Sequence, residues 1–352
     1  MSEIITYFQQ LPLYISVSVF FGLTIVIWIA GTFLVYLVDA IADKTKIAKA
    51  FLGFVLLAVI TELPEVVTTM TAAASNNAQL ALNNMFGGIS LQMTLLVLAD
   101  ILIAQKTLTS FPRKPTPVIE GLFLIIMLTI LLVFYFIGDF SFISHVGFAS
   151  VFMAFLYLSS VFITKRFTTS ETWRPFEMPE SSKGKAKKSP SNYMKLSLKK
   201  LFMYISLSAL VILIFGLLIT LIAEAIAVKS GLGTSFIGVT MLALVTSLPE
   251  LSTVIAAVRI KSYTLAISNI LGSNLIMVFL ILPADLMFSQ GLIINSIDTT
   301  AALALLSGII ITAIYCIGLL FRGTKRLLRM GIDSILVLVF YILSLTLFYH
   351  FR

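Results

Sequence analysis

Charge, histidine and cysteine are all scarce in this sequence. Of its 352 residues only 11% are charged, two are histidine and one is cysteine. The single cysteine, Cys316, excludes an internal disulfide framework and a multi-cysteine metal site. The histidines, His145 and His350, stand near the start of an apolar run and at the C-terminus, so neither has the setting of a metal ligand or proton relay.

Apolar residues fill the space that charge leaves. The chain is 59% hydrophobic and its mean hydropathy is +1.06, far outside the range of soluble globular proteins. A spanning helix needs about 20 mostly apolar residues, so the chain has room for roughly ten of them. The start, MSEIITYFQQLP, lacks a basic n-region, so we expect no cleavable signal peptide. The sequence therefore predicts an all-α, multi-pass membrane protein in the lipid bilayer.

The apolar runs and their polar breaks predict ten transmembrane helices. Lys and Arg gather in every second loop, which the positive-inside rule places in the cytoplasm, with both termini outside and the plasma (inner) membrane as the expected location. The net charge of +8 is thus an orientation signal, and we expect no nucleic-acid partner. We place the spans at about 13–39, 49–74, 79–104, 117–137, 142–163, 198–227, 233–258, 264–288, 299–321 and 332–349.

One long hydrophilic segment divides the chain. It runs from Lys165 to Lys200, with SSKGKAKKSPS at its centre, a composition that cannot bury a core. We assign 165–197 to a basic cytoplasmic linker between a first five-helix repeat, 1–164, and a second, 198–352. A solvated linker is the simpler interpretation of this segment, and a regulatory or anionic-lipid contact is the alternative.

The two halves contain copies of one segment. A shift of 185 residues aligns Asp39–Glu65 with Glu224–Glu250 without a gap, and the register continues to Gln92. About a third of the positions in this stretch are identical to their mates, as in the duplicated halves of transporters. Because each half has an odd number of spans, the second copy enters from the opposite side, which predicts inverted repeats. We name 58–92 the first repeat motif and 243–277 the second.

The first repeat motif places two carboxylates, Glu62 and Glu65, inside an apolar run. A carboxylate at membrane depth is expensive, so it usually faces a cavity, a partner or an ion. Pro64 lacks a backbone donor and breaks the helical ladder, which frees carbonyls near Thr61 and Val59. Acids and freed carbonyls together predict discontinuous helices and an oxygen-lined site for a hard cation.

The second motif supplies the partner acid, Glu250. Inverted repeats bring the same residue of each copy to the membrane midplane, so Glu65 and Glu250 should face one another there. Two acids within about 5 Å repel each other unless a cation lies between them. Downstream amides, Asn84 and Asn269, add neutral oxygens, although they could equally serve as polar contacts between helices.

These motifs resemble those of the sodium/calcium exchanger family of the cation/Ca²⁺ antiporter superfamily. In that family each repeat reads close to GTSLPE followed by GNxxGSN, and here the segments are TELPE with NMFGG and TSLPE with NILGSN. The resemblance covers both repeats and, through the ten-span architecture, nearly the whole chain. It implies a secondary antiporter that exchanges Ca²⁺ for Na⁺ at one central site, with no cofactor and no enzymatic activity.

The resemblance also implies roles for individual residues. It assigns Ca²⁺ to the carboxylates of Glu65 and Glu250 and to the carbonyls of Thr61 and Thr246. It places Na⁺ sites around Ala58, Ala243, Ser247 and Ser273. The two glutamates are shared between the ions, so one ion must leave before the other binds, and access alternates as the first and sixth spans slide over the core.

Four positions depart from the family pattern. Gly88 stands where Ser is usual, while Gln92 and Met277 stand where Asn or Asp is usual. Gln92 still offers an amide oxygen, whereas the Met277 thioether is a poor ligand for a hard cation. Glu62 replaces the usual Ser and lies about one helical turn from Glu65. Protons carried by Glu62 are therefore an alternative to Na⁺, which gives a Ca²⁺/H⁺ or other divalent-cation/H⁺ antiporter.

Some acids have simpler interpretations. Glu62 could point into an aqueous vestibule, and Glu65 and Glu250 could only accept backbone hydrogen bonds in a kinked helix. The matched acids near span ends are interpreted as helix-end or interfacial groups: Asp39, Asp100, Glu224 and Asp285.

Other functional classes fit less well. An intramembrane enzyme lacks its GxGD, HExxH or aspartate-rich motif here. A non-transporting ion sensor would need a recognisable domain in the linker, and a channel needs weaker sites than two opposed glutamates. The sequence does not indicate an oligomeric state.

Overall fold

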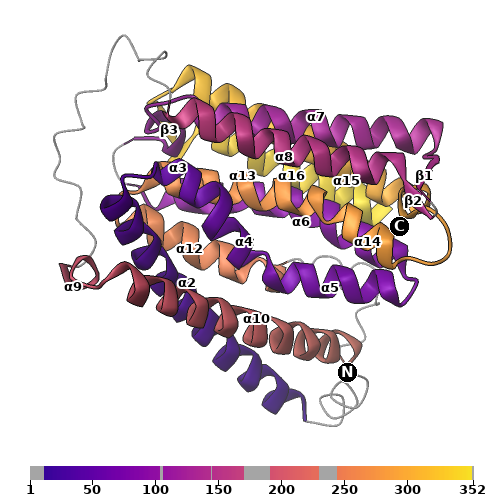
Figure 1. The fold of residues 1–352 in the computed structure, drawn as a ribbon, viewed down its shortest axis with the longest axis horizontal. Helices are drawn as coiled ribbons and strands as arrows, with labels where there is room; N and C mark the ends of the chain where they lie inside the picture. Colours follow the sequence, from indigo (N-terminus) through magenta and orange to yellow (C-terminus); the bar gives the residue numbers. More distant parts are fainter. Residues whose placement is uncertain (1–11, 104–105, 144, 170–190, 230–243, 351–352) are drawn as a thin grey trace.

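The computed structural model describes residues 12–103, 106–143, 145–169, 191–229 and 244–350. They form a helical bundle with two small hairpins (Figure 1). The main elements are α2 (Leu13–Thr45), α3 (Lys49–Leu52), the π-helical turn η1 (Gly53–Leu57), α4 (Ala58–Thr61), α5 (Leu63–Ala74), α6 (Ala78–Ile101), α7 (Thr116–Ile137), β1 (Ser141–Ile143), β2 (Val146–Gly147), α8 (Phe148–Thr169), α9 (Ser191–Met194), α10 (Leu198–Lys229), α12 (Leu248–Arg259), α13 (Tyr263–Phe279), α14 (Ile281–Met287), α15 (Thr299–Phe321), β3 (Arg326–Leu327), β4 (Met330–Gly331) and α16 (Ile332–His350). The short 3₁₀ turns η2 (Leu108–Ser110) and η4 (Ile293–Ser296) lie in loops.

Most expected spans coincide with helices. Among the described residues, seven helices are long and apolar enough to cross a membrane, and a bent pair, Lys49–Thr61 with Leu63–Ala74, makes an eighth. Helix α16 is apolar but shorter. Residues 230–243, at the start of the expected span 233–258, lie outside the described part. The all-helical membrane architecture is confirmed, while the count of ten spans stays a prediction.

The fifth expected span begins later than predicted. The strands Ser141–Ile143 and Val146–Gly147 pair as the antiparallel hairpin β1–β2, and α8 starts only at Phe148. The apolar letters SFI belong to a strand because Gly138, at φ +77°, ends α7 and the chain must turn before it re-enters the bundle. At its other end α8 continues to Thr169, into the segment expected as linker.

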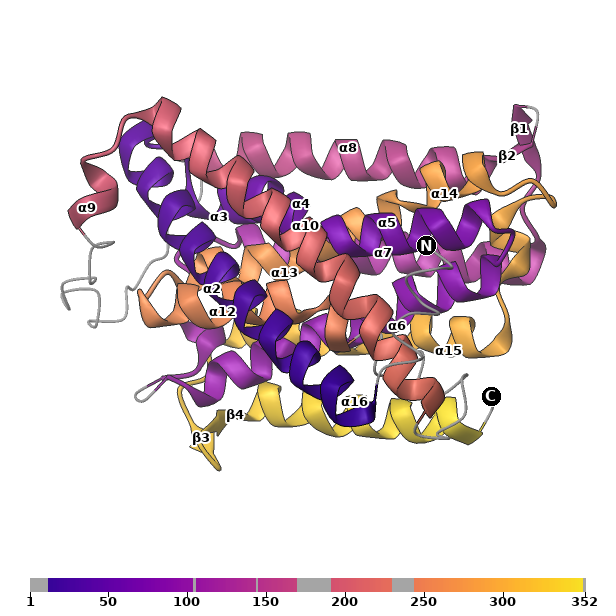
Figure 2. The same cartoon turned by 90° about the horizontal axis from the view of Figure 1, so that it is seen from below.

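Helices α6 and α13 form the centre of the bundle. In the most apolar window of each, 83% and 89% of the residues are buried. The long helices α2 and α10 pack along each other on one side of this centre, and α12 contacts α2 (Figures 1 and 2). In Figure 2, α8 and α16 lie along opposite edges of the bundle.

Two glycines let η1 approach α13 closely. A Cβ on Gly53 would lie 2.7 Å from the Leu265 carbonyl oxygen, and a Cβ on Gly272 would lie 2.8 Å from the Cα of Phe54. Neither contact tolerates a side chain, so these two segments meet backbone to backbone, as is common where membrane helices pack tightly. This contact fixes the polypeptide just before the broken helix against α13.

Candidate ion-binding site

The candidate site is built at two helix breaks with the same local conformation. Helix α4 ends at Thr61, and the next residue, Glu62, has φ and ψ of −78° and −2°. Helix α5 then leaves at 51° to the preceding segment, with Pro64 in its first turn. In the second copy Ser247 has φ −80° and ψ 7°, and Pro249 follows in the first turn of α12. Because proline cannot donate a backbone hydrogen bond, both helical ladders are interrupted, at Glu62 and at Ser247, three residues before Glu65 and Glu250.

A π-helical turn precedes the first break. It covers Gly53–Leu57, directly before α4. Such turns are rare and occur frequently at functional sites. Together with the break at Glu62 they shift the backbone register, so the Thr61 carbonyl stands at the end of α4, outside a continuous helical ladder.

The breaks bring three carboxylates together. One oxygen from each of Glu62, Glu65 and Glu250 lies within 4.8 Å of the others, and all three side chains have no exposed surface. Glu62 therefore does not point into a vestibule. Glu65 and Glu250 come from the two repeat motifs, so the meeting predicted from the repeat is present in the structure.

The carboxylate oxygens have few protein partners. The amide of Gln92 donates to Glu62 Oε1 at 2.7 Å, whereas the other Glu62 oxygen and both oxygens of Glu65 and Glu250 have no hydrogen-bond partner in the described part of the chain. The Glu65 and Glu250 carboxylates lie near their own backbone amides, but neither makes a hydrogen bond of regular geometry there. Buried acids without partners fit a site that is completed by a cation or by protons.

Basic residues do not neutralise this cluster. Ion pairs in the described part of the chain include those of Lys49, at the start of α3, with Asp39 and Asp43 of α2, and none involves Glu62, Glu65 or Glu250. Three ionised carboxylates would repel each other strongly at this depth, where the effective dielectric constant is low. The cluster is therefore stable only with added positive charge, from protons or from a bound cation.

Hydroxyl groups of each copy face the acid of the other copy. The Thr246 side chain lies beside the Glu65 carboxylate, and the Thr61 side chain lies beside that of Glu250. Ser273 stands 3.4 Å from the Thr61 hydroxyl and also faces Glu62. The hydroxyls of Thr61, Thr246 and Ser273 thus lie beside the carboxylates, across the boundary between the two halves.

The residues predicted to bind sodium differ in whether their oxygens are free to bind an ion. The Ala58 carbonyl already accepts from the Glu62 amide at 3.0 Å and from the Thr61 hydroxyl at 3.2 Å, so both its lone-pair directions are used. The Ser247 hydroxyl is buried and has no hydrogen-bond partner among the described residues. Ala243 lies outside the described part.

The two expected asparagines differ. Asn269 donates to the Thr253 hydroxyl at 3.1 Å, which ties α13 to α12, while its carbonyl oxygen is unpartnered. Asn84 is buried, and neither its amide nitrogen nor its oxygen has a hydrogen-bond partner in the described structure. Asn269 thus combines a contact between helices with a spare oxygen, and Asn84 is available as a ligand.

Two departures from the family pattern pack against each other. The Met277 methyl lies 2.7 Å, and its sulfur 3.5 Å, from the position that a Cβ on Gly88 would take. Met277 therefore fills the volume that a serine side chain at position 88 would need. This contact between α6 and α13 therefore has a thioether where the family pattern has a hydroxyl and an amide or acid.

The matched acids Asp100 and Asp285 act as structural acceptors. Asp100 receives bonds from the Leu108 amide at 2.6 Å, the Gly331 amide at 2.7 Å and the Ser334 hydroxyl at 2.9 Å. Asp285 receives the equivalent three at 2.7–2.8 Å, from Ile293, Gly147 and Ser150. Both are fully buried. Each aspartate therefore ties the end of one helix to the hairpin and first turn of another.

Two buried polar residues, Asn274 and Glu120, were not among the site residues predicted from the sequence. Asn274 follows Ser273 on α13, and both its amide atoms lack a partner in the described chain. Glu120 is a fully buried carboxylate in α7, away from the repeat motifs. A lone acid inside the apolar run 117–137 was the available signal for Glu120.

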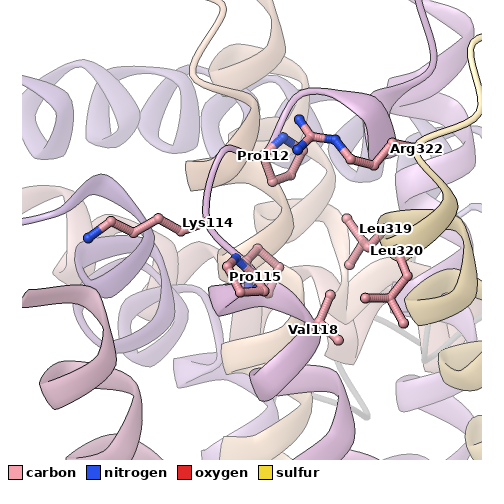
Figure 3. A pocket seen from close by; sticks show the side chains of 8 residues that line it. Pro112, Lys114, Pro115, Val118, Leu319, Leu320 and Arg322 are labelled. Atoms are coloured by element: carbon pink, nitrogen blue, oxygen red, sulfur yellow. The ribbon is translucent and has the colours of Figure 1, made fainter. Parts of the chain in front are cut away.

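A surface pocket of about 70 Å³ lies elsewhere (Figure 3). It is formed where α7 begins and α15 ends, and its polar side chains are Lys114 and Arg322. Lys114 donates to the Thr168 carbonyl and Arg322 to the Ser110 carbonyl. A pocket lined by two cations and no acid does not suit a cation substrate.

Comparisons with known proteins agree on a family. The model of the family described as "Sodium/calcium exchanger protein" matches residues 15–164 and 192–350. The putative antiporter CaxA of Alkalimonas amylolytica is 26% identical over 282 residues, which cover 79% of this chain and 82% of that protein.

Solved structures of the sodium-calcium exchanger NCX_Mj share the fold. The form soaked with 2.5 mM Na⁺ and 0.1 mM Ca²⁺ aligns with a TM-score of 0.67 at 19% identity, covering 94% of this chain and 98% of that one. The form soaked with 10 mM Na⁺ and 10 mM Sr²⁺ gives 0.70 at 17% identity, covering 95% and 99%. Because the family model spans both halves of the chain, this protein belongs to the sodium/calcium exchanger family, whose members are membrane antiporters for cations and not enzymes.

Proposed function

We propose that this protein exchanges Ca²⁺ for Na⁺ through the three-carboxylate site. The observation that supports this is the buried cluster of Glu62, Glu65 and Glu250, with oxygens within 4.8 Å of one another. Ca²⁺ takes six to eight oxygen ligands, and carboxylates, threonine carbonyls and nearby amides supply that type of donor. Thr61, Thr246, Ser247, Ser273, Asn84, Asn269 and Gln92 are the proposed neutral contributors.

Shared carboxylates make the exchange obligatory. Removing Ca²⁺ leaves up to three negative charges in a buried site, a state that costs several kcal/mol per uncompensated ion. Monovalent cations must replace the divalent ion before the site can be stable again. Alternating access then requires that the loaded site open to one side at a time, which we assign to motion of α2 and α10, the paired helices at one side of the bundle.

A second candidate is Ca²⁺/H⁺ exchange. Glu62 adds a carboxylate that a proton can neutralise, and Gln92 holds it at 2.7 Å. At positions 88 and 277, where the family pattern has a hydroxyl and an amide or acid, Gly88 and Met277 offer no oxygen ligand to a sodium ion. These two observations together favour protons as an alternative coupling ion.

The deciding experiment is radioactive calcium uptake into proteoliposomes. An outward Na⁺ gradient is compared with an outward proton gradient, with the membrane potential clamped at zero. Uptake driven by Na⁺ supports the proposal, and uptake driven only by protons selects the second candidate. No uptake under either gradient contradicts both.

We also propose that the two halves, 1–164 and 198–352, are inverted repeats joined by the linker 165–197. The matched backbone at Glu62 and Ser247, and the matched acceptor roles of Asp100 and Asp285, support a common origin. With the basic loops in the cytoplasm, both termini lie outside.

A further inference from the structure

A second group of buried oxygens lies away from the three-carboxylate site. Its centre is Glu120 on α7, which has no exposed surface and no hydrogen-bond partner for either carboxylate oxygen within the described residues. Ser268 on α13 faces this carboxylate. Thr116 lies one turn before Glu120 on the same helix face. The hydroxyls of Ser268 and Thr116 are likewise buried and unpartnered in the described chain.

Helix α15 closes the group from a third direction. The Thr312 methyl lies 3.6 Å from where a Cβ on Gly121 would be, and the Cys316 sulfur is closer still. Cys316 also lies near the Glu120 charge. Thr312 and Cys316 are one turn apart on α15, and the Thr312 hydroxyl is buried without a partner in the described part. Helices α7, α13 and α15 therefore each carry a buried, unpartnered hydroxyl in the region of Glu120.

These hydroxyls are unusual in this bundle. Most helical hydroxyls here donate to a carbonyl in the preceding turn, as Thr129 does to Ile125 at 2.7 Å and Thr220 does to Gly216 at 2.9 Å. Such a bond satisfies a hydroxyl buried in a helix. Thr116, Ser268 and Thr312 make no such bond, so their oxygens stay available to a ligand.

We propose that Glu120, Thr116, Ser268 and Thr312 form a second cation site that binds a monovalent metal ion of the size of Na⁺. Hard cations take carboxylate and hydroxyl oxygens. One carboxylate balances one positive charge, whereas a divalent ion would retain an uncompensated charge in a buried site. A proton on Glu120 would give one of these hydroxyl oxygens a donor and leave the others unpartnered, while a coordinated ion satisfies several together.

The test must separate this site from the three-carboxylate site. In a Glu62→Gln, Glu65→Gln, Glu250→Gln background, the unfolding temperature of the full chain in detergent is measured against Na⁺ at constant ionic strength, with N-methylglucamine as replacement. We expect the unfolding temperature to rise with Na⁺. Adding Glu120→Gln should abolish that rise. A rise that persists unchanged with Glu120→Gln, or no rise in the background protein, overturns the proposal.

A second set of variants keeps the carboxylate in place. Thr312→Val and Ser268→Ala should each weaken the apparent Na⁺ affinity by about tenfold, the effect of 1.4 kcal/mol. Thr129→Val on α7 is the matched control, because that hydroxyl is exposed and bonded to its own helix, and it should leave the Na⁺ dependence unchanged. Equal affinity in Thr312→Val, Ser268→Ala and the control contradicts the site, whether or not the Glu120→Gln protein folds.

Discussion

At the scale of single residues, Glu65 and Glu250 give the most direct test of the site. Glu65→Gln and Glu250→Gln each remove a charge that Ca²⁺ needs but keep the side-chain volume. We expect either variant to reduce calcium exchange to background in proteoliposomes, while the protein elutes as a folded species in size-exclusion chromatography.

Asp43→Asn is the matched control for these variants. Asp43 is partly exposed and lies 3.6 Å from Lys49, remote from the cluster. Pairs of this kind contribute little, about 0–1 kcal/mol, so this variant should keep its transport activity. Substantial exchange by the Glu65 or Glu250 variant would remove the central site from the mechanism.

The contact between Gly88 and Met277 makes a second prediction at this scale. Gly88→Ala places a Cβ 2.7 Å from the Met277 methyl, and such overpacking costs about 1–3 kcal/mol of unfolding free energy. Met277→Ala removes the obstacle, so the double variant should lose less stability than the sum of the two single variants. Chemical unfolding in detergent measures all three, and strict additivity would show that the two side chains do not interact.

At the scale of the helices and hairpins, the two buried aspartates hold separate helices together. Each aspartate accepts three hydrogen bonds through its two carboxylate oxygens. In Asp100→Asn and in Asp285→Asn an NH₂ group replaces one of these oxygens, so at least one of the three donors loses its acceptor. Lost bonds to a charged acceptor and an unpaired donor predict a loss of about 2–4 kcal/mol for each. Thermal unfolding in detergent should show a lower midpoint for both variants.

Asp298→Asn provides the comparison. Asp298 is the N-cap of α15 and accepts from the Ala301 amide at 2.7 Å. Asparagine caps helices about as well as aspartate, so this variant should unfold close to the wild-type midpoint. If Asp100→Asn and Asp285→Asn unfold at the same midpoint as Asp298→Asn, the buried aspartates do not hold the helices together as proposed.

At the scale of the whole molecule, orientation can be tested with single cysteines, because the chain has one native cysteine and it is buried. In a Cys316→Ala background, Leu328→Cys, in the exposed β3–β4 turn, should react with an impermeant maleimide only from the cytoplasmic side. Phe142→Cys, in the exposed β1–β2 hairpin, should react only from the outside. The reverse pattern would invert the proposed topology.

The sequence was sufficient for the features that depend on local pattern. Apolar runs located the helices, Pro64 located the break after Glu62, and the gapless repeat indicated that Glu65 and Glu250 would meet. These follow from periodicity, a missing backbone donor and symmetry, all of which are visible in one chain.

Contacts between distant helices were not accessible in this way. The bond from Gln92 to Glu62 and the contact of Met277 with Gly88 depend on rotamers and on the separation of packed helices. The Asp285 bonds depend on the β1–β2 hairpin, whose apolar residues resemble the start of a span, and the Asp100 bonds depend on the β3–β4 hairpin, which stands in an expected loop. The Glu120 group needed three helices placed together before its hydroxyls could be connected to one carboxylate.

The Met277–Gly88 contact also bears on how this site can have evolved. A serine at position 88 collides with methionine at 277, and an aspartate at 277 opposite a glycine leaves a polar gap, so we expect either change alone to lower stability. Relatives with a long apolar side chain at the position of Met277 are therefore expected to have glycine at the position of Gly88. The two sites should covary as one inherited unit, and ancestral intermediates between the two pairings should be rare.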